Sequence, residues 1–277
     1  MSSQQAIVSP RVVQVEGNAV RVLTLGLDDR VRGEPVFVLQ AGAGSVLESW
    51  DYLFMLEIAA WAPVVAYDRP GLGGSAFDGQ DPTVDHVADH LRSLLGVIEV
   101  EPPYILIGHS WGGPLILHHA ARYPDDVVGM VYVDPSDPHR EGLPTDPAER
   151  ASALAALDSV MNQPYVPSGR RAAMRAFVEY WSPAPQDRVI PPNPDVPTAV
   201  VLGTLVGYDV PDAERPALEA FQLKRVEGIR AWFGDVRRLH WTVAPDAGHF
   251  VQRDDPYLVA SAVRQVLDWV RAARAAR

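Results

Sequence analysis

The segment Gly108–Gly113 reads Gly-His-Ser-Trp-Gly-Gly and places a serine between two glycines at two-residue spacing. It follows the apolar run 104–107 and precedes a helical pattern over 114–122, so the serine lies at a strand-to-helix turn. Such a turn holds the serine in a strained backbone conformation and projects its hydroxyl beyond the strand, while the glycines allow close packing. Ser110 is therefore the candidate nucleophile, and acyl transfer is the chemistry that it predicts.

A serine hydroxyl is a poor nucleophile at neutral pH and needs a base, for which the pKa of histidine is suitable. His249 follows the last predicted strand, in the loop Ala247-Gly248-His249-Phe250, and is the predicted base among eight histidines. His86 and His90 are four residues apart, but no further ligand pattern accompanies them, so we predict a polar helix face and no metal site. His109 is predicted to point away from the nucleophile.

The base in turn needs a carboxylate that fixes its tautomer and stabilises the imidazolium. Asp134 ends the predicted strand 127–133, and Asp209 follows the predicted strand 199–202. Both aspartates are candidates for this role, and Asp137 is a weaker third candidate.

These motifs, in this order, resemble the α/β-hydrolase superfamily in its serine, carboxylesterase or lipase-like branch, over nearly the whole chain. Two more segments contribute to the resemblance. Gln40–Ser45 follows the third predicted strand, where the family usually has a His-Gly oxyanion loop, and Tyr67–Gly73 resembles the turn after the fourth. The pair Gln40-Ala41 departs from the usual His-Gly.

The resemblance also bears on the choice of acid. The family usually takes its acid about three residues beyond a glycine such as Gly203, where this chain has Val206. Asp209 would therefore require a lengthened loop. Some members take the acid from the end of the sixth strand, at the spacing that Asp134 shows, so the triad predicted is Ser110, His249 and Asp134.

Acyl transfer also requires two backbone N–H donors aimed at the oxyanion of the tetrahedral intermediate. By the resemblance, Trp111 supplies one donor, and Ala43 or Gly42 supplies the second.

The implied reaction is two-step hydrolysis of a carboxylic ester through an acyl-enzyme, with a small to medium apolar substrate and without a cofactor. A serine nucleophile argues against the dehalogenases and epoxide hydrolases of the superfamily, which need a carboxylate. Hydrolysis of a lactone, an amide or a carbon–carbon bond, acyl transfer and perhydrolysis remain open. A slow-turnover small-molecule receptor on the same fold also remains open.

The elements that must position these residues alternate in an α/β pattern. A predicted hairpin over 12–25 precedes short apolar runs that are separated by helical patterns, which indicates a mostly parallel eight-stranded sheet with helices on both faces. The predicted strands are 12–15, 20–25, 36–39, 64–67, 104–107, 127–133, 199–202 and 239–243, and the predicted helices are 84–98, 114–122, 147–161, 169–181, 213–233 and 257–273.

The sequence divides into a predicted core, residues 1–136 and 197–277, and a predicted helical cap, residues 137–196, inserted after the sixth strand. The cap segment shows helical patterns and no strand pattern. Its large apolar side chains either line a substrate pocket or form the core of the cap, and these are Met161, Met174, Phe177, Tyr180 and Trp181.

Composition excludes several classes of protein. The net charge of −11 opposes binding to nucleic acid, and the absence of cysteine excludes disulfides and thiolate metal sites. The start of the chain lacks the features of a secretory signal, and no run of about 18 apolar residues indicates a membrane span. We expect a cytoplasmic protein that acts on a small molecule without a metal, and the sequence leaves its oligomeric state open.

Overall fold

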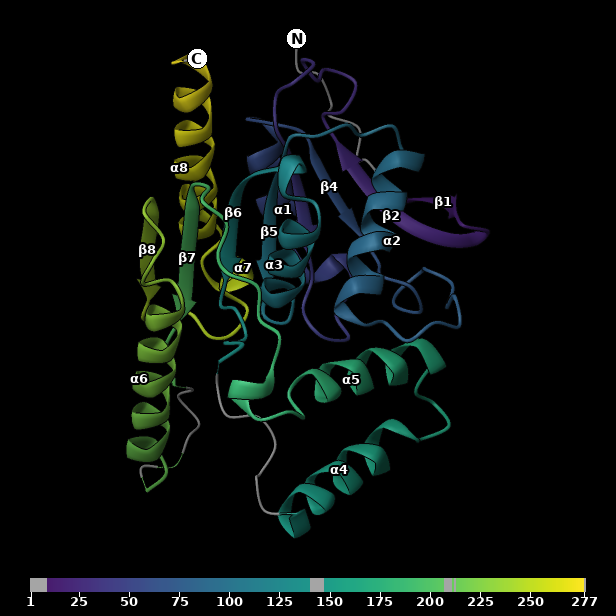
Figure 1. The fold of residues 1–277 in the computed structure, drawn as a ribbon, viewed down its shortest axis with the longest axis vertical. Helices are drawn as coiled ribbons and strands as arrows, with labels where there is room; N and C mark the ends of the chain where they lie inside the picture. The colour runs from purple at the N-terminus through teal and green to yellow at the C-terminus, as the bar shows by residue number, and fades with distance from the viewer. Residues whose placement is uncertain (1–8, 140–146, 207–210, 212, 277) are drawn as a thin grey trace.

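The structure is a computed structural model that describes residues 9–139, 147–206, 211 and 213–276. An eight-stranded sheet with the order β1-β2-β4-β3-β5-β6-β7-β8 forms its centre (Figure 1). The strands are β1 (Arg11–Val15), β2 (Asn18–Leu25), β3 (Val36–Gln40), β4 (Val64–Tyr67), β5 (Tyr104–His109), β6 (Val127–Val133), β7 (Thr198–Gly203) and β8 (Leu239–Ala244).

The direction of the strands follows their burial. Strands β3, β4, β5 and β7 are buried along their whole length, and all neighbours from β4 to β8 pair in parallel, as expected for apolar runs covered on both faces. β1 and β2 form an antiparallel hairpin, and β2 pairs antiparallel with β4. The predicted mostly parallel eight-stranded sheet is confirmed.

Helices cover both faces of the sheet. Helices α1 and α8 pack against one face, and α2, α3 and the end of α6 pack against the other. The helices are α1 (Tyr52–Ala59), α2 (Val84–Val97), α3 (Gly112–Arg122), α4 (Pro147–Met161), α5 (Ser168–Tyr180), α6 (Arg215–Trp232), α7 (Val251–Asp254) and α8 (Pro256–Ala275). Among the described residues, no helix combines the length and apolar composition that crossing a bilayer requires.

Local signals explain where several helices begin. Thr83 accepts a hydrogen bond from the His86 N–H at 3.2 Å and caps α2, and Asp255 caps α8 through the Leu258 N–H at 3.0 Å. Helix α3 begins at Gly112, two residues before the predicted start, because the turn that holds the serine leads directly into the helix. The helices α1 and α7 were not predicted.

The carboxyl ends of β5, β6, β7 and β8 lie at one edge of the sheet, where the candidate residues Ser110, Asp134 and His249 follow their strands. Figure 1 shows α4 and α5 beyond this edge, in the segment that connects β6 with β7. In the fold, therefore, these two helices lie on the side of the sheet to which the candidate catalytic residues belong.

Candidate active site

Ser110 has a backbone φ of 54°, in the left-handed region that a non-glycine residue rarely adopts. The glycines around it are explained by contact distances. A Cβ at Gly112 would lie 2.0 Å from the Gln40 carbonyl oxygen, and a Cβ at Gly108 would lie 2.5 Å from the carbonyl oxygen of Gly112. The Ser110 N–H donates to the Val133 carbonyl at 3.1 Å. The turn is thus held between the ends of β3 and β6.

His249 and Asp134 meet at this edge, although they are 115 positions apart in the chain. His249 Nδ1 lies 2.6 Å from Asp134 Oδ2. Asp134 is only 3% exposed, whereas half of the His249 side chain, 51%, is exposed. A carboxylate at Nδ1 favours the tautomer that carries the proton there and leaves the lone pair of Nε2 free to accept a proton.

The second carboxylate oxygen of Asp134 also accepts hydrogen bonds. Asp134 Oδ1 accepts one hydrogen bond from the Gly203 N–H and one from Arg225 Nη1, each at 2.9 Å. Arg225 lies on α6 and also donates from Nη2 to the Gly203 carbonyl. The sequence analysis did not identify Arg225, because no local pattern connects a residue in the middle of a helix with an aspartate 91 positions away.

Two other aspartates, Asp209 and Asp137, were candidates for the acid. Asp209 is outside the described residues. Asp137 accepts a hydrogen bond from the His139 N–H at 2.8 Å, and its Oδ2 would be 2.7 Å from a Cβ at Gly228 on α6. Within the described part of the chain, Asp134 is the carboxylate that His249 contacts.

The loop after β3 lies against the serine. A Cβ at Gly42 would be 3.2 Å from Ser110 Cβ, which is a close contact. The backbone N–H groups of Gly42, Ala43 and Trp111 donate to no acceptor among the described residues. The structure therefore brings all three candidate oxyanion donors to the neighbourhood of Ser110.

Arg69 holds this loop in place through hydrogen bonds to its backbone carbonyls. Its side chain is 5% exposed, and its guanidinium donates to the carbonyl of Ala41 at 2.5 Å and to the carbonyl of Gly42. Burial lowers the pKa of Arg69 from its usual value. Tyr67 donates its hydroxyl hydrogen to Gln40 Oε1 at 2.6 Å, so the unusual Gln40 also has a buried partner. Arg69 and Tyr67 belong to a segment that the sequence singled out, but these contacts were not predicted.

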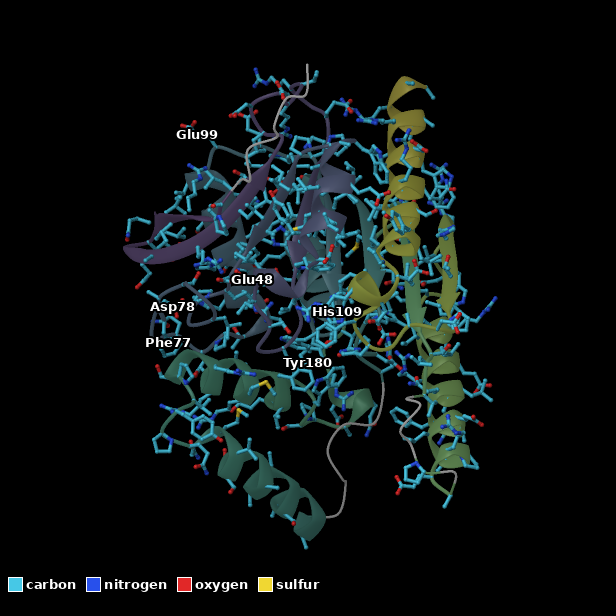
Figure 2. All side chains as sticks on the ribbon, turned by 180° about the vertical axis from the view of Figure 1, so that it is seen from behind. Glu48, Phe77, Asp78, Glu99, His109 and Tyr180 are labelled. Carbon is cyan, nitrogen blue, oxygen red and sulfur yellow. The ribbon has the colours of Figure 1, made fainter. Side chains whose placement is uncertain are left out.

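His109 supports the loop that contains His249. His109 Nε2 lies 2.8 Å from the His249 carbonyl oxygen, and the two rings lie 4.7 Å apart between centroids. Burial, together with the nearby His249, lowers the pKa of His109 to about 4, so the ring is neutral near pH 7 and donates the hydrogen of Nε2. Figure 2 shows His109 at the edge of the core above α5, with Tyr180 on the α5 side.

The prediction for the other histidine pair was partly wrong. His86 contacts Asp78 at 2.7 Å, but His90 is buried with 4% exposure instead of lying on a polar face. Its neighbours in the core, Leu91 and Leu94, show that this side of α2 packs inward. No group of three or more potential metal-ligating side chains occurs among the described residues.

Helix α5 packs on the residue after the serine. Trp111 is 4% exposed and forms edge contacts with Phe177, Tyr180 and Trp181, at centroid distances of 5.4, 4.7 and 6.1 Å. These aromatic side chains form a small apolar cluster with Val87. They therefore pack as a core between α5 and the turn that contains Ser110.

Ser110 Oγ forms no hydrogen bond with a side chain or carbonyl of the described residues. A nucleophile and its base are often separated in a free enzyme and come together only when substrate binds. The serine is half-buried and the base half-exposed, so a carbonyl group can approach both.

Comparison with known proteins identifies the family of this chain. A model of the alpha/beta hydrolase family matches residues 36–262. Lipase LipV of Mycobacterium tuberculosis is 30% identical over 74% of this chain and 83% of its own length, and the uncharacterized protein YqjL of Bacillus subtilis is 35% identical over 36% of this chain.

The match covers only 39% of YqjL, and two further relatives are matched over 41% of their length. A thermophilic esterase from Thermogutta terrifontis has a similar fold, with a TM-score of 0.67, 18% identity and coverage of 95% of this chain and 99% of that one. The chain therefore belongs to the alpha/beta hydrolase family.

Proposed function

We propose that the protein is a serine hydrolase that cleaves carboxylic esters through an acyl-enzyme, with Ser110, His249 and Asp134 as its catalytic triad. The contact of 2.6 Å between His249 Nδ1 and Asp134 Oδ2, beside a serine with a left-handed backbone, is the observation that supports this proposal most directly. Membership of the hydrolase family and the similarity to a lipase agree with it.

In the first step, Ser110 Oγ attacks the ester carbonyl carbon, and its proton passes to His249 Nε2. The tetrahedral intermediate collapses, the bond to the alcohol oxygen breaks, and His249 returns the proton to that oxygen. In the second step, water attacks the acyl-enzyme, His249 takes and returns one proton, and the carboxylic acid leaves. Asp134 stabilises the imidazolium in both steps.

The negative oxygen of each intermediate is held by backbone hydrogen bonds. We assign one donor to the Trp111 N–H and the other to Ala43 or Gly42. The free N–H groups and the close contact between Gly42 and Ser110 support this assignment. Each such donor contributes about 3 kcal/mol to the stability of the transition state in hydrolases of this kind.

We further propose that residues 137–196 act as a cap over the site. The packing of α5 on Trp111 supports this role, because it places a closed aromatic cluster next to the nucleophile. With Trp111 held in that cluster, we expect the site to accept small or medium acyl groups.

The test is hydrolysis of p-nitrophenyl acetate, butyrate and octanoate by the wild-type protein and by Ser110→Ala. We expect multiple turnover that the alanine variant loses and that Ser93→Ala, a change of a serine far from the site, retains. Rapid mixing at high enzyme concentration should show a burst equal to the enzyme concentration, followed by steady turnover.

A single burst without further turnover would indicate a slow-turnover receptor and would contradict the proposed hydrolase. Turnover that persists in Ser110→Ala would contradict the assignment of the nucleophile. Labelling by a fluorophosphonate, located by peptide mass spectrometry, gives an independent check, because the label should be on Ser110.

A further inference from the structure

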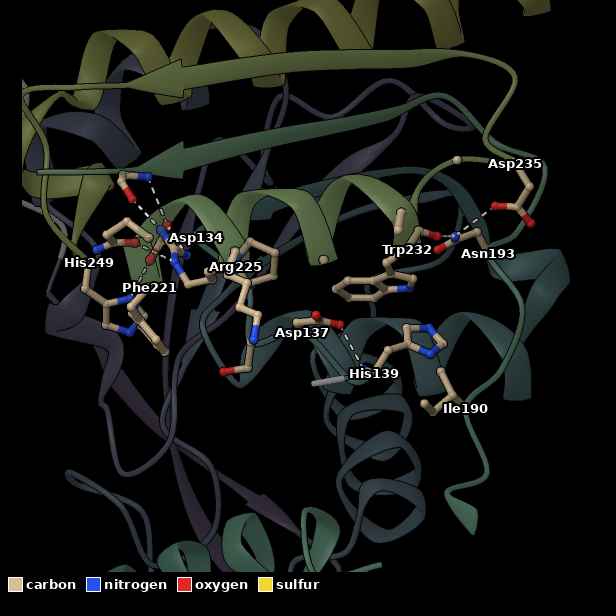
Figure 3. A pocket seen from close by; sticks show the side chains of 18 of the residues that line it. Asp134, Asp137, His139, Ile190, Asn193, Phe221, Arg225, Trp232, Asp235 and His249 are labelled. Atoms are coloured by element: carbon tan, nitrogen blue, oxygen red, sulfur yellow. Dashed lines mark hydrogen bonds and ion pairs between the residues drawn. The ribbon is translucent and has the colours of Figure 1, made fainter. Parts of the chain in front are cut away.

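A cavity of about 1230 Å³ begins at His249 and extends along α6. Figure 3 shows His249, Asp134, Phe221 and Arg225 at one end, Asp137 between the two ends, and Trp232, Asn193 and Asp235 at the other end. Its walls come from α6, from the segment after β6 and from the segment before β7. The apolar part of the lining includes Ile190, Pro191, Pro192, Phe221 and Trp232.

Two polar groups at the far end of the cavity have no partner. Trp232 Nε1 and Asn193 Oδ1 are buried and form no hydrogen bond with any described residue. Trp232 is 6% exposed, and the amide nitrogen of Asn193 is already used, since it donates to the Trp232 carbonyl at 2.7 Å. Burying a donor or an acceptor without a partner costs about 1–3 kcal/mol. One donor and one acceptor at the far end therefore lack a partner, and because both atoms are covered, a ligand reaches them only when the side chains around them shift.

The ion pair at the His249 end of the cavity is complete within the protein. Arg225 is paired with Asp134 at 2.9 Å and donates a further hydrogen bond to the Gly203 carbonyl. A charged ligand would have to break this pair to form an ion pair with Arg225 or Asp134. Together with the apolar side chains of the lining, this favours a ligand with an apolar body.

The reaction determines which part of the substrate lies here. His249 must give its proton to the leaving oxygen, so the alcohol part of the ester lies on the side of His249, and His249 lines this cavity. We propose, on the basis of the proposed esterase function, that the cavity binds the alcohol part of the substrate. This part is an extended, mainly apolar group with a hydroxyl, or a similar donor and acceptor, at its far end.

The length of this group follows from helix geometry. Arg225, beside the catalytic end, and Trp232, at the far end, are seven positions apart on α6. A rise of 1.5 Å per residue makes this about 10 Å. An extended octyl chain with carbon–carbon bonds of roughly 1.5 Å has a similar length. A terminal hydroxyl on such a chain would reach the level of Trp232 Nε1 and Asn193 Oδ1.

The experiment compares ethyl, octyl and ω-hydroxyoctyl acetates with ethyl octanoate, in which the long chain is on the acyl side. Ala231→Phe fills the cavity from α6, and Ala217→Phe on the same helix, outside the cavity, is the matched control. We expect Ala231→Phe to lower kcat/KM for both octyl acetates about tenfold relative to ethyl acetate. The ratio between ethyl octanoate and ethyl acetate should stay unchanged.

Two further measurements separate this effect from general damage. Deacylation of the acetyl-enzyme should be unaltered in Ala231→Phe, because the alcohol has already left. Trp232→Phe removes the indole N–H and should lower kcat/KM for ω-hydroxyoctyl acetate on the order of tenfold relative to octyl acetate. Trp241→Phe, on β8 and outside the cavity, should leave this ratio at its wild-type value.

The outcomes distinguish this proposal from the one on which it rests. Loss of activity by Ala231→Phe specifically on ethyl octanoate would make the cavity an acyl pocket and would overturn the proposal. Serine-dependent turnover of all esters that is insensitive to both cavity variants would also overturn it, while the esterase function would stand. Absence of any turnover that depends on Ser110 would refute the esterase function, and the alcohol site would fall with it.

Discussion

Arg225 Nη1 lies 2.9 Å from Asp134 Oδ1, while His249 contacts the other oxygen of the same carboxylate. Because Arg225 also donates to the Gly203 carbonyl, it links the candidate acid to the end of β7. The carboxylate therefore has one orientation, and this orientation determines where the imidazole lies.

We predict that Arg225→Gln lowers kcat by up to about 100-fold, because a catalytic group misplaced by 1 Å can cost that much. KM for ethyl acetate should change little, since the small substrate does not extend along α6. Arg225→Lys, which keeps a charge and a donor, should recover part of the rate. Steady-state kinetics on the three proteins tests this, and equal loss in the lysine and glutamine variants would contradict a positioning role.

The second prediction concerns the identity of the acid. Asp134→Asn should lower kcat by about 10⁴-fold, because an amide no longer fixes the tautomer of His249 or stabilises the imidazolium. Asp209→Asn should keep nearly the wild-type rate. Thermal unfolding of both variants shows whether they are folded. A large loss in Asp209→Asn with a small loss in Asp134→Asn would move the acid to the loop after β7.

The sheet could be predicted because its strands are short apolar runs between turn residues, as β5 and β6 illustrate. Helix α1 could not be predicted from periodicity. Its sequence Tyr-Leu-Phe-Met-Leu-Glu-Ile-Ala is apolar nearly throughout, so it has no polar face that marks a helical period. Its one local signal is Asp51, which caps the helix through the Leu53 N–H at 2.9 Å and the Phe54 N–H at 3.1 Å.

Some residues of the candidate site could likewise be predicted from the sequence, and others could not. Ser110, His249 and the loop at Gly42 could be found from local motifs, because each motif has a strand before it and glycines around it. Arg225 could not, since its role depends on how α6 packs beside β7, which no short pattern encodes. The contact between His109 and His249 is likewise a tertiary feature, between residues 140 positions apart.

The third prediction concerns the oxyanion loop. Arg69→Met leaves the carbonyls of Ala41 and Gly42 without their charged partner, so the N–H groups of the loop lose a fixed direction. We expect kcat to fall about 100-fold, similar to the loss of one oxyanion donor. A trifluoromethyl ketone, which forms a tetrahedral adduct with a serine, should bind more weakly by a similar factor, whereas KM should change little.

Arg253→Met is the matched control, because Arg253 also donates to backbone carbonyls, those of Glu48 and Ser49, but away from the oxyanion loop. Arg69→Lys should restore part of the affinity for the ketone. If Arg69→Met lowers thermal stability but keeps the wild-type kcat, Arg69 supports the fold alone.

The fourth prediction is a loss of stability in acid that comes from buried histidines. Burial lowers the pKa of His109 and of His119 from 6.5 to about 4. Below pH 6.5 the unfolded chain binds protons that the folded chain does not bind. The free energy of unfolding is thus highest above pH 6.5 and falls as the pH decreases towards 4, by about 1.4 kcal/mol per pH unit for each histidine.

His119 is the better residue for the test, because it lies on α3 among apolar residues and away from His249. Urea unfolding at several pH values between 4 and 7 gives the slope of stability against pH for wild type, His119→Leu and His119→Gln. Neither substituted side chain titrates, so both variants should lose about 1.4 kcal/mol per pH unit of the slope, although their stabilities at pH 7 will differ. A wild-type slope in both variants would mean that His119 is protonated equally in the folded and unfolded chain, and the acid sensitivity would then have to come from other groups.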